Sequence, residues 1–370
     1  MENVIKVYMK FPWRFYSGPY HKSIIENPPK EIEFVNYKEK KIKKEIVKSN
    51  KNFENLRKIK NILRKILSLL KIPNLTYVFH SEYDIIHCAH CLSLNKKPWV
   101  VDTETYEWLA SSGSISHSKI GKMIIKNRLK SKYCKKIVCW SQDAKKSFEK
   151  EFQKEKEILE KIEILHFGLK NVSFKKIKKG DKIILLFVAR RFGEKGGFQT
   201  LRVFDEITKK NKKVEAIIIC PTPNYIKKKY SKNKQIKIIE LVPQEKLFRE
   251  IYPSADIFFY PGIRDTYGIA IPEAMSFGLP ILTLDGMAKK EIVSNGKTGF
   301  IIRRPKEIMN DEEMNEEMIK EFVEKTSLLI KNKKLRDRMS KNAVKEAKEK
   351  FSIEKRNEKL QKIYEEALKN

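Results

Sequence analysis

Short apolar segments alternate with amphipathic, often lysine-rich segments along almost the whole of this 370-residue chain. The longest apolar run, Ile183 to Ala189, has the length of a buried strand and is far shorter than a membrane span. Such alternation is typical of parallel β-sheets whose crossover helices cover both faces. Because one hydrophobic core rarely extends over a chain of this length, the sequence predicts an α/β fold with two domains.

The individual elements follow from the same alternation. The first half is expected to hold a loop over Phe11 to His21, a lysine-rich helix over Asn52 to Lys71, and a helix from Ala144 capped by Ser141. Strands are predicted at Val4 to Lys10, Ile85 to His87, Trp99 to Asp102, Lys136 to Trp140, Ile162 to Gly168, Lys182 to Val188, Val214 to Cys220, Ile236 to Glu240, Ile257 to Tyr260, Ile281 to Leu284 and Gly299 to Ile302. Further helices are predicted near Gly197 to Thr208, Gln244 to Ile251, Ile271 to Phe277, Met309 to Lys331 and Ser352 to Leu368.

A polar, basic stretch from Lys170 to Lys182 separates the two halves. We therefore predict an N-terminal domain at residues 1–169 and a C-terminal domain at residues 170–350. Residues 351–370 are expected to form a helix that packs back toward the first domain.

The formal net charge of +32 raises the question of an anionic partner. Lysines are spread along the chain and interleaved with glutamates, as in Lys145 to Lys161, so a solvated basic surface is favoured. Contact with an anionic membrane is the next reading, supported by Trp13, Phe15, Tyr16 and Tyr20 in one loop, and nucleic acid is the least favoured. Without an apparent signal peptide, the expected location is the cytoplasm, at the inner face of the membrane.

Five cysteines are present, an odd number that argues against a disulfide framework. His87, Cys88, His90 and Cys91 lie close together in the sequence and suggest zinc. A continuing strand would point Cys88 and Cys91 to opposite faces, and Cys134 and Cys139 are not spaced like a zinc knuckle. Packing at a strand end is therefore preferred, and no metal site is predicted.

Two segments of the second half carry the chemistry. In Phe187 to Gly197 a strand ends, Arg190 and Lys195 follow, and glycines open a helix. Small residues, helix-start amides and two cations are what a diphosphate requires, although a salt-bridged turn explains the pattern equally well.

The second segment runs from Pro261 to Pro280 and places Asp265 and Glu273 around a glycine-containing turn and a helix start. Carboxylates accept hydrogen bonds from vicinal hydroxyls, so the pair fits a ribose and a hexose. For Glu273 alone, the helix dipole is a sufficient explanation.

In this order the two segments resemble the retaining glycosyltransferases of family 4 (glycosyl transferases group 1), which adopt the GT-B fold. The resemblance also covers Leu247 to Ile257 and Glu291 to Phe300, and it is weaker in the first half. It implies two Rossmann-like domains whose parallel sheets face each other across a cleft. By resemblance Arg190 and Lys195 would bind the donor diphosphate, Glu273 the nucleotide ribose, and Asp265 the transferred sugar. The amides of Tyr267, Gly268 and Ile269 would face the sugar and the phosphates.

In the first half, Gly18 stands where the family has a Gly-Gly pair near the donor phosphates. Glu104 occupies the position of a His that the family often places in the cleft, and His90 is a second candidate for that role. The implied enzyme is a hexosyltransferase-type glycosyltransferase that uses a nucleotide diphosphate sugar and needs no cofactor. Its acceptor would be a hydroxyl of a lipid or glycan, in glycolipid, cell-surface polysaccharide or glycan synthesis.

The implied mechanism retains the anomeric configuration, with the acceptor approaching the face that the diphosphate leaves. Arg190 and Lys195 would stabilise the departing charge. Two alternatives stay open: a sugar-nucleotide epimerase with the same fold, and a nucleic-acid-binding protein on an inactive transferase fold.

Overall fold

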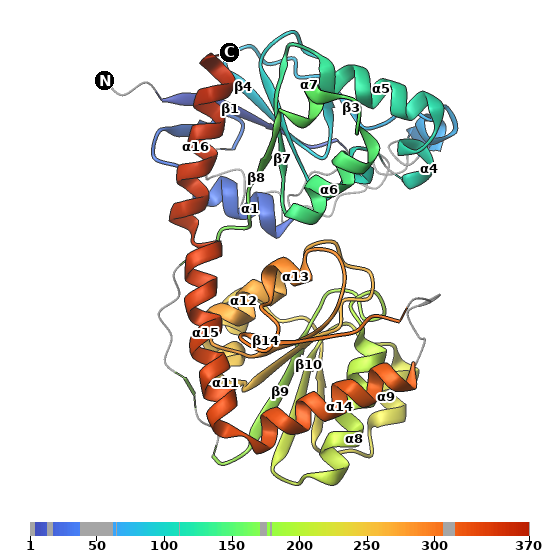
Figure 1. Cartoon of the computed structure of the whole chain (residues 1–370), viewed down its shortest axis with the longest axis vertical. Helices are drawn as coiled ribbons and strands as arrows, with labels where there is room; N and C mark the ends of the chain where they lie inside the picture. Colours follow the sequence, from blue (N-terminus) through green and yellow to red (C-terminus); the bar gives the residue numbers. More distant parts are fainter. Residues whose placement is uncertain are drawn as a thin grey trace, which may run out of the picture. The chain divides into compact units, whose positions relative to one another are not determined.

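A computed structural model describes residues 4–12, 18–37, 62–63, 65–110, 112–170, 176–177, 180–305 and 315–369. The chain forms two compact units, Met1–Gly168 with Ile353–Asn370, and Leu169–Ser352 (Figure 1). Most of the helix expected over Asn52 to Lys71, the start of the one expected at Met309, and residues 13–17 with three of the loop aromatics lie outside the described residues.

The first unit is built on a six-stranded parallel sheet in the order β2-β1-β4-β6-β7-β8. Its central strands β4 and β6 are buried at every residue, as strands covered on both faces must be. The elements are β1 (Ile5–Lys10), α1 (Pro19–Glu26), β2 (Ile32–Phe34), β3 (Leu75–Thr76), β4 (Ile85–Ala89), β5 (Leu92–Ser93), β6 (Trp99–Thr103), a 3-10 turn (Tyr106–Leu109), α4 (Gly113–Ser116), α5 (Lys119–Lys130), β7 (Cys134–Cys139), α6 (Gln142–Glu151), α7 (Lys156–Leu159), β8 (Ile162–Ile164) and α16 (Ile353–Lys369).

Two details of this unit bear on the sequence predictions. Ser141 caps α6 as predicted, its hydroxyl accepting from the amide of Ala144 at 3.0 Å. The loop expected over Phe11 to His21 is too long, because α1 already begins at Pro19, whose fixed φ suits a first helical position. Tyr20, expected in an exposed aromatic loop, is 1% exposed and stacks on Trp140 with ring centroids 3.8 Å apart.

The C-terminal helix α16 belongs to the first unit and is tied to it by polar contacts (Figure 1). Arg356 donates to the carbonyls of Ser23 and Asn27, and Lys136 of β7 pairs with Glu366 at 2.6 Å. The last helix therefore completes the core that the first half of the chain begins.

The second unit has a parallel sheet in the order β11-β10-β9-β12-β13-β14. Both units are thus Rossmann-like, and the predicted α/β class with two parallel sheets is confirmed. The elements are β9 (Ile183–Val188), α8 (Gly197–Lys210), β10 (Val214–Ile219), α9 (Asn224–Tyr230), β11 (Ile236–Ile239), α10 (Gln244–Lys246), a short π-helix (Leu247–Ile251), α11 (Tyr252–Ser254), β12 (Ile257–Tyr260), α12 (Ala270–Ser276), β13 (Ile281–Leu284), α13 (Lys289–Ile292), β14 (Gly299–Ile302), α14 (Glu316–Lys331) and α15 (Lys333–Phe351).

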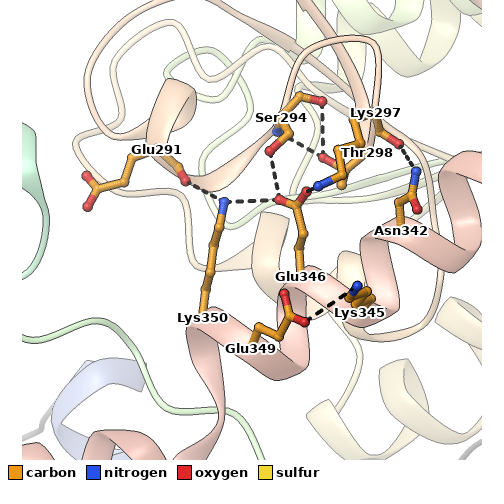
Figure 2. A network of polar contacts seen from close by, with 9 residues as sticks. All are labelled: Glu291, Ser294, Lys297, Thr298, Asn342, Lys345, Glu346, Glu349 and Lys350. Carbon is orange, nitrogen blue, oxygen red and sulfur yellow. Dashed lines mark hydrogen bonds and ion pairs between the residues drawn. The ribbon is translucent and has the colours of Figure 1, made fainter.

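A buried carboxylate fastens α15 to the loop between α13 and β14 (Figure 2). Glu346 is 4% exposed and contacts Lys297 Nζ at 2.8 Å, Lys350 Nζ at 3.0 Å and the Ser294 hydroxyl at 2.7 Å. Burial by itself would raise the pKa of this carboxyl, but the three donors lower it below its ordinary value. The loop that carries the family-like residues 295–300 is therefore held by a charged contact with α15.

We expect Glu346→Gln to lower the free energy of unfolding by about 1–2 kcal/mol at neutral pH, because charge-assisted hydrogen bonds are lost. Since the folded pKa is depressed, this contribution exists above the unfolded pKa and disappears as pH falls through the folded one. Denaturant unfolding at several pH values measures it. Glu349→Gln, on the same helix and exposed beside Lys345 at 3.9 Å, is the control and is expected to change stability less. Equal effects of the two variants would contradict the assignment.

The structure describes no helix long and apolar enough to cross a bilayer.

Candidate functional site

The candidate site lies in the second unit, where the strand order of the sheet reverses. From β9 the chain proceeds to β10 and β11 on one side, and then returns to β12, β13 and β14 on the other. In open α/β sheets, ligands bind beyond the carboxyl ends of the strands that flank such a reversal. Arg190 follows the end of β9 and Asp265 follows the end of β12, so both predicted segments reach this point.

Backbone hydrogen bonds join the two predicted segments. The amide of Gly262 donates to the carbonyl of Lys195 at 3.0 Å, and the amide of Arg264 donates to that of Glu194 at 2.8 Å. Pairing of the loops brings Lys195 and Asp265 together, and Lys195 Nζ lies 2.8 Å from Asp265 Oδ1. Two residues that are 70 positions apart in sequence thus form an ion pair.

Contacts within the protein, and not the approach of a ligand, explain why glycines stand at the start of α8. A Cβ on Gly196 would lie 2.5 Å from Pro261, and one on Gly197 would lie 2.4 Å from the Phe192 ring. Gly196 also has φ of +82°, a left-handed conformation that favours glycine. These two glycines are therefore required by packing within the protein, and the expectation that they exist to let a ligand approach is not needed to explain them.

Asp265 sits among partly buried groups. Its second oxygen, Oδ2, is buried. Burial, and then the charge of Asp265 and a side-chain hydrogen bond with it, raise the pKa of the Tyr260 hydroxyl well above its ordinary value. An oxygen so placed offers a hydrogen-bond acceptor to an incoming hydroxyl.

Lys289 adds a cation that sequence reasoning did not identify. Its side chain is 1% exposed, and Nζ donates to the carbonyl of Gly262 at 2.9 Å. Burial lowers its pKa to about 8, although nearby Asp265 favours the charged form. No local pattern points to Lys289, since it follows β13 and reaches the site only through the fold.

Glu273 and Arg190 form the second half of the site. Glu273 lies in the first turn of α12, as predicted, and is 8% exposed. Its carboxylate accepts from the Tyr252 hydroxyl at 3.2 Å and from Gln244 Nε2 at 3.3 Å. Burial raises its pKa to about 7, against the effects of Tyr252, Gln244 and the charge of Arg190. Arg190 is exposed and close enough to Glu273 to act on it electrostatically.

The turn before α12 places the predicted amides. Gly268 has φ of +81°, which again favours glycine, and Ile269 immediately precedes the helix. Tyr267, two residues before Ile269, is 3% exposed. The first amides of a helix have no carbonyl partner within it.

The predicted residues of the first half lie in the other unit. Gly18 directly precedes α1, and a Cβ there would meet no atom within 4 Å. Glu104 follows β6 and is partly exposed. His90 follows β4 with φ of +54°, and its ring lies 5.1 Å from that of Trp140. His90 and Glu104 therefore stand at the carboxyl ends of β4 and β6, and Gly18 at the start of α1, whereas the other predicted site residues belong to the second unit.

The cysteine cluster packs at a strand end, as predicted. The strand does not continue to Cys91: it ends at Ala89, His90 turns the chain, and the two buried thiols come into contact. Burial, and then contact with Cys91, raises the pKa of Cys88 well above its ordinary value. All five cysteines are free and buried.

These features define a domain of known type. Residues 170–346 match the family model described as glycosyl transferases group 1. This part of the chain therefore matches a glycosyl transferases group 1 domain, which confirms this much of the predicted resemblance.

Particular relatives are more distant. The chain is 25% identical over 229 residues to the capsular polysaccharide biosynthesis glycosyltransferase CapM of Staphylococcus aureus, covering 56% of this chain and 56% of that protein. It is 25% identical over 133 residues to the phosphatidylinositol N-acetylglucosaminyltransferase GPI3 subunit of Saccharomyces cerevisiae, covering 35% of this chain and 29% of that protein. The chain thus spans less than two thirds of these curated relatives.

Solved structures extend the likeness to the whole chain. A glycosyltransferase from Rickettsia africae superposes with a TM-score of 0.67 at 15% identity over 100% of both chains. Anabaena Alr3699/HepE, in complex with UDP-glucose, gives 0.61 at 13% identity over 98% of this chain and 99% of that one. At these identities the likeness establishes the fold, two Rossmann-like halves as in GT-B glycosyltransferases.

The raised pKa of Glu273 predicts how donor binding depends on pH. Hydroxyl donors bind the ionised carboxylate, so affinity for a nucleotide diphosphate sugar is expected to rise through about pH 7. One pH unit below this value only about a tenth of Glu273 is ionised, which predicts an approximately tenfold weaker Kd. Titration calorimetry between pH 6 and 8 measures the effect. Tyr252→Phe removes a hydrogen bond that lowers this pKa, and is expected to move the midpoint to higher pH. A pH-independent Kd would contradict the role of Glu273.

Proposed function

We propose that the protein is a retaining, family 4-type glycosyltransferase that moves a hexose from a nucleotide diphosphate sugar to a hydroxyl acceptor. The observation that carries this proposal is the grouping of Arg190, Lys195, Asp265 and Glu273 at the point where the second sheet reverses its strand order. Each group suits one part of such a donor: the two cations its diphosphate, Glu273 its ribose and Asp265 its sugar.

The roles follow from charge and burial. Arg190 and Lys195 neutralise the diphosphate, and the fixed position of Lys195 lets it stabilise charge as the diphosphate leaves. Glu273, held by Tyr252 and Gln244, accepts hydrogen bonds from the ribose hydroxyls. Asp265 keeps a buried acceptor oxygen for a hydroxyl of the transferred sugar. The amides of Tyr267, Gly268 and Ile269 face the sugar and phosphates.

In the proposed reaction the acceptor oxygen replaces the diphosphate at the anomeric carbon, and it attacks from the same face that the diphosphate leaves. The leaving phosphate takes the acceptor proton, so no side chain beside the anomeric carbon needs to act as a base. Positive charge from Arg190 and Lys195 supplies the main stabilisation of the transition state. No cofactor is required in this scheme. In the first unit, Gly18 is assigned to the donor phosphates, and Glu104 and His90 to the acceptor.

The proposed acceptor is a lipid-linked or glycan hydroxyl, in glycolipid, cell-surface polysaccharide or glycan synthesis. We extend the proposal to a cytoplasmic protein that contacts the inner, anionic face of a membrane. The net charge of +32 supports this, as do exposed apolar side chains of the first unit such as Leu69 (81%) and Phe79 (92%). Flotation with phosphatidylserine-containing liposomes at physiological salt tests it, and absence of co-flotation would remove the membrane contact.

A thermal-shift screen of nucleotide diphosphate sugars tests the donor. We expect a rise in Tm with at least one of them, and loss of that rise in Arg190→Ala. Lys210→Ala, a surface lysine of α8 paired with Glu206, is the matched control. No shift with any nucleotide sugar would contradict the proposal.

Incubation of the protein with the donor alone, monitored by NMR, distinguishes a retaining transferase from an inverting transferase and from an epimerase. Slow release of free sugar with its original anomeric configuration supports a retaining transferase, whereas an inverted configuration or an epimerised nucleotide sugar contradicts it. The comparisons above support neither a sugar-nucleotide epimerase nor a nucleic-acid-binding protein.

A further inference from the structure

A second group of polar side chains lies in the first unit, close to the carboxyl ends of the central strands β4 and β6. His21 of α1 places Nε2 at 2.8 and 3.0 Å from the two oxygens of Asp102. His87 of β4 places Nε2 at 3.2 Å from the same carboxylate. His21 is 3% exposed, and His87 and Asp102 are fully buried. One buried carboxylate is thus approached by two imidazoles.

The position of this cluster is that of a ligand site. The first sheet reverses its strand order between β1 and β4, and α1 follows β1. His21 comes from that helix, and His90 stands just beyond the carboxyl end of β4. The general rule for open α/β sheets places ligands at this reversal.

The backbone at His90 is held in an uncommon conformation. Its φ of +54° is left-handed, which is costly for a residue other than glycine. The His90 amide donates to the carbonyl of Asp102 at 3.0 Å, and Asn74 Nδ2 donates to the carbonyl of His90 at 3.1 Å. These two bonds fix the turn and direct the His90 ring toward His21, with ring centroids 5.5 Å apart. Strain that the surroundings maintain in this way is concentrated at functional sites.

Two further side chains lie behind the carboxylate of Asp102. His87 Nε2 is fully buried and lies 3.2 Å from Asp102 Oδ2. The other nitrogen of His87, Nδ1, lies 2.6 Å from the Tyr364 hydroxyl. His87 and Tyr364 therefore form an outer layer of the kind that orients a carboxylate ligand of a metal ion.

We propose that His21, His90 and Asp102 bind a divalent transition-metal ion of the zinc type. One ligand atom from each lies within 4.8 Å of the other two. Ligand atoms about 2.0–2.2 Å from a tetrahedral zinc are roughly 3.3 Å apart, so a contraction of about 1.5 Å at most completes the set. Two imidazoles and a carboxylate suit zinc, cobalt or iron, and three protein ligands leave a position for an oxygen of a bound molecule.

The residue types are also appropriate. The carboxylate of Asp102 supplies a negative charge to the site, and a metal ion would take the place of the hydrogen bond between His21 and Asp102.

Cobalt titration of the whole purified chain, after treatment with a chelator, tests the proposal. We expect one equivalent of Co²⁺ to bind with the visible absorption of a low-coordinate site, and Zn²⁺ to displace it. His90→Asn removes a ligand and keeps a residue that tolerates the left-handed backbone. Loss of an outer partner of a metal ligand weakens metal binding by about 10–100-fold. We expect the Kd of His90→Asn for Co²⁺ to rise by more than this. Asp102→Asn is the second variant, and circular dichroism verifies the fold of each.

His117→Ala is the matched control, because this histidine lies in the same unit near Glu107 and Glu151 with 53% of its side chain exposed. It should bind Co²⁺ as the unmodified chain does. Absence of stoichiometric uptake, uptake that His90→Asn leaves unchanged, or equal loss in His117→Ala would each overturn the proposal. Because the readout is metal content and absorption, the outcome is independent of whether the protein transfers sugar.

Discussion

Lys195→Ala is expected to lower the rate of donor cleavage by about 10²–10³-fold, since it removes a preorganised cation from the leaving diphosphate. Lys195 is held in place by two contacts within the protein: Nζ contacts Asp265 at 2.8 Å and the carbonyl of Arg264 at 3.2 Å. A cation that is held before the reaction needs little reorganisation when charge develops beside it. The measurement is release of nucleoside diphosphate from the donor found in the thermal-shift screen, with water as the acceptor.

The ion pair with Asp265 offers an alternative explanation of such a loss, and a double-mutant cycle separates the two. If Lys195 only positions Asp265, then Asp265→Asn should lose as much as Lys195→Ala, and the double variant should lose no more. If Lys195 acts on the phosphates, the lysine variant should be slower than the asparagine variant. Lys210→Ala, at the other end of α8, should leave the rate unchanged. Unchanged cleavage in Lys195→Ala would end the assignment.

How far the sequence predicts this site depends on the distance between the interacting residues along the chain. Arg190 with Lys195, and Asp265 with Glu273, are local pairs beside strand ends, and strand ends can be recognised from apolar runs. The alternation of apolar and polar segments likewise predicts both sheets. Boundaries were less accurate, because a proline or a capping residue decides them: α1 begins at Pro19, inside the expected loop.

Contacts between distant segments were not predicted. Tyr252 and Gln244, 21 and 29 residues before Glu273, donate hydrogen bonds to its carboxylate. Lys289, which follows β13, contacts the carbonyl of Gly262. His21 and Asp102 meet across 81 residues. No periodicity links such pairs, and they are decided by which strands become neighbours and in what register. Tyr20 shows the same limit, since only the folded chain reveals that Trp140 covers it.

Glu273→Ala is expected to weaken donor binding by about 2–4 kcal/mol, or roughly 30- to 1,000-fold in Kd, because two hydroxyls of the ribose lose a charged acceptor. Calorimetry at pH 8, where the carboxyl is mostly ionised, gives the full effect. Glu245→Ala, a surface glutamate paired with Arg249 on the adjacent helical stretch, is the control and should bind the donor normally.

Stability distinguishes this role from a structural one. The pKa of Glu273 in the folded protein, about 7, lies above the ordinary carboxyl value of 4.5, so ionisation between these values opposes folding. At pH 8 the charged carboxylate therefore lowers the free energy of unfolding of the protein without donor, by about 3 kcal/mol. Glu273→Gln keeps an acceptor for the Tyr252 hydroxyl and removes the charge, so its Tm without donor should equal or exceed that of the unmodified chain. A carboxylate retained for ligand binding gives weaker binding together with undiminished stability, whereas a large fall in Tm would assign Glu273 to the fold instead.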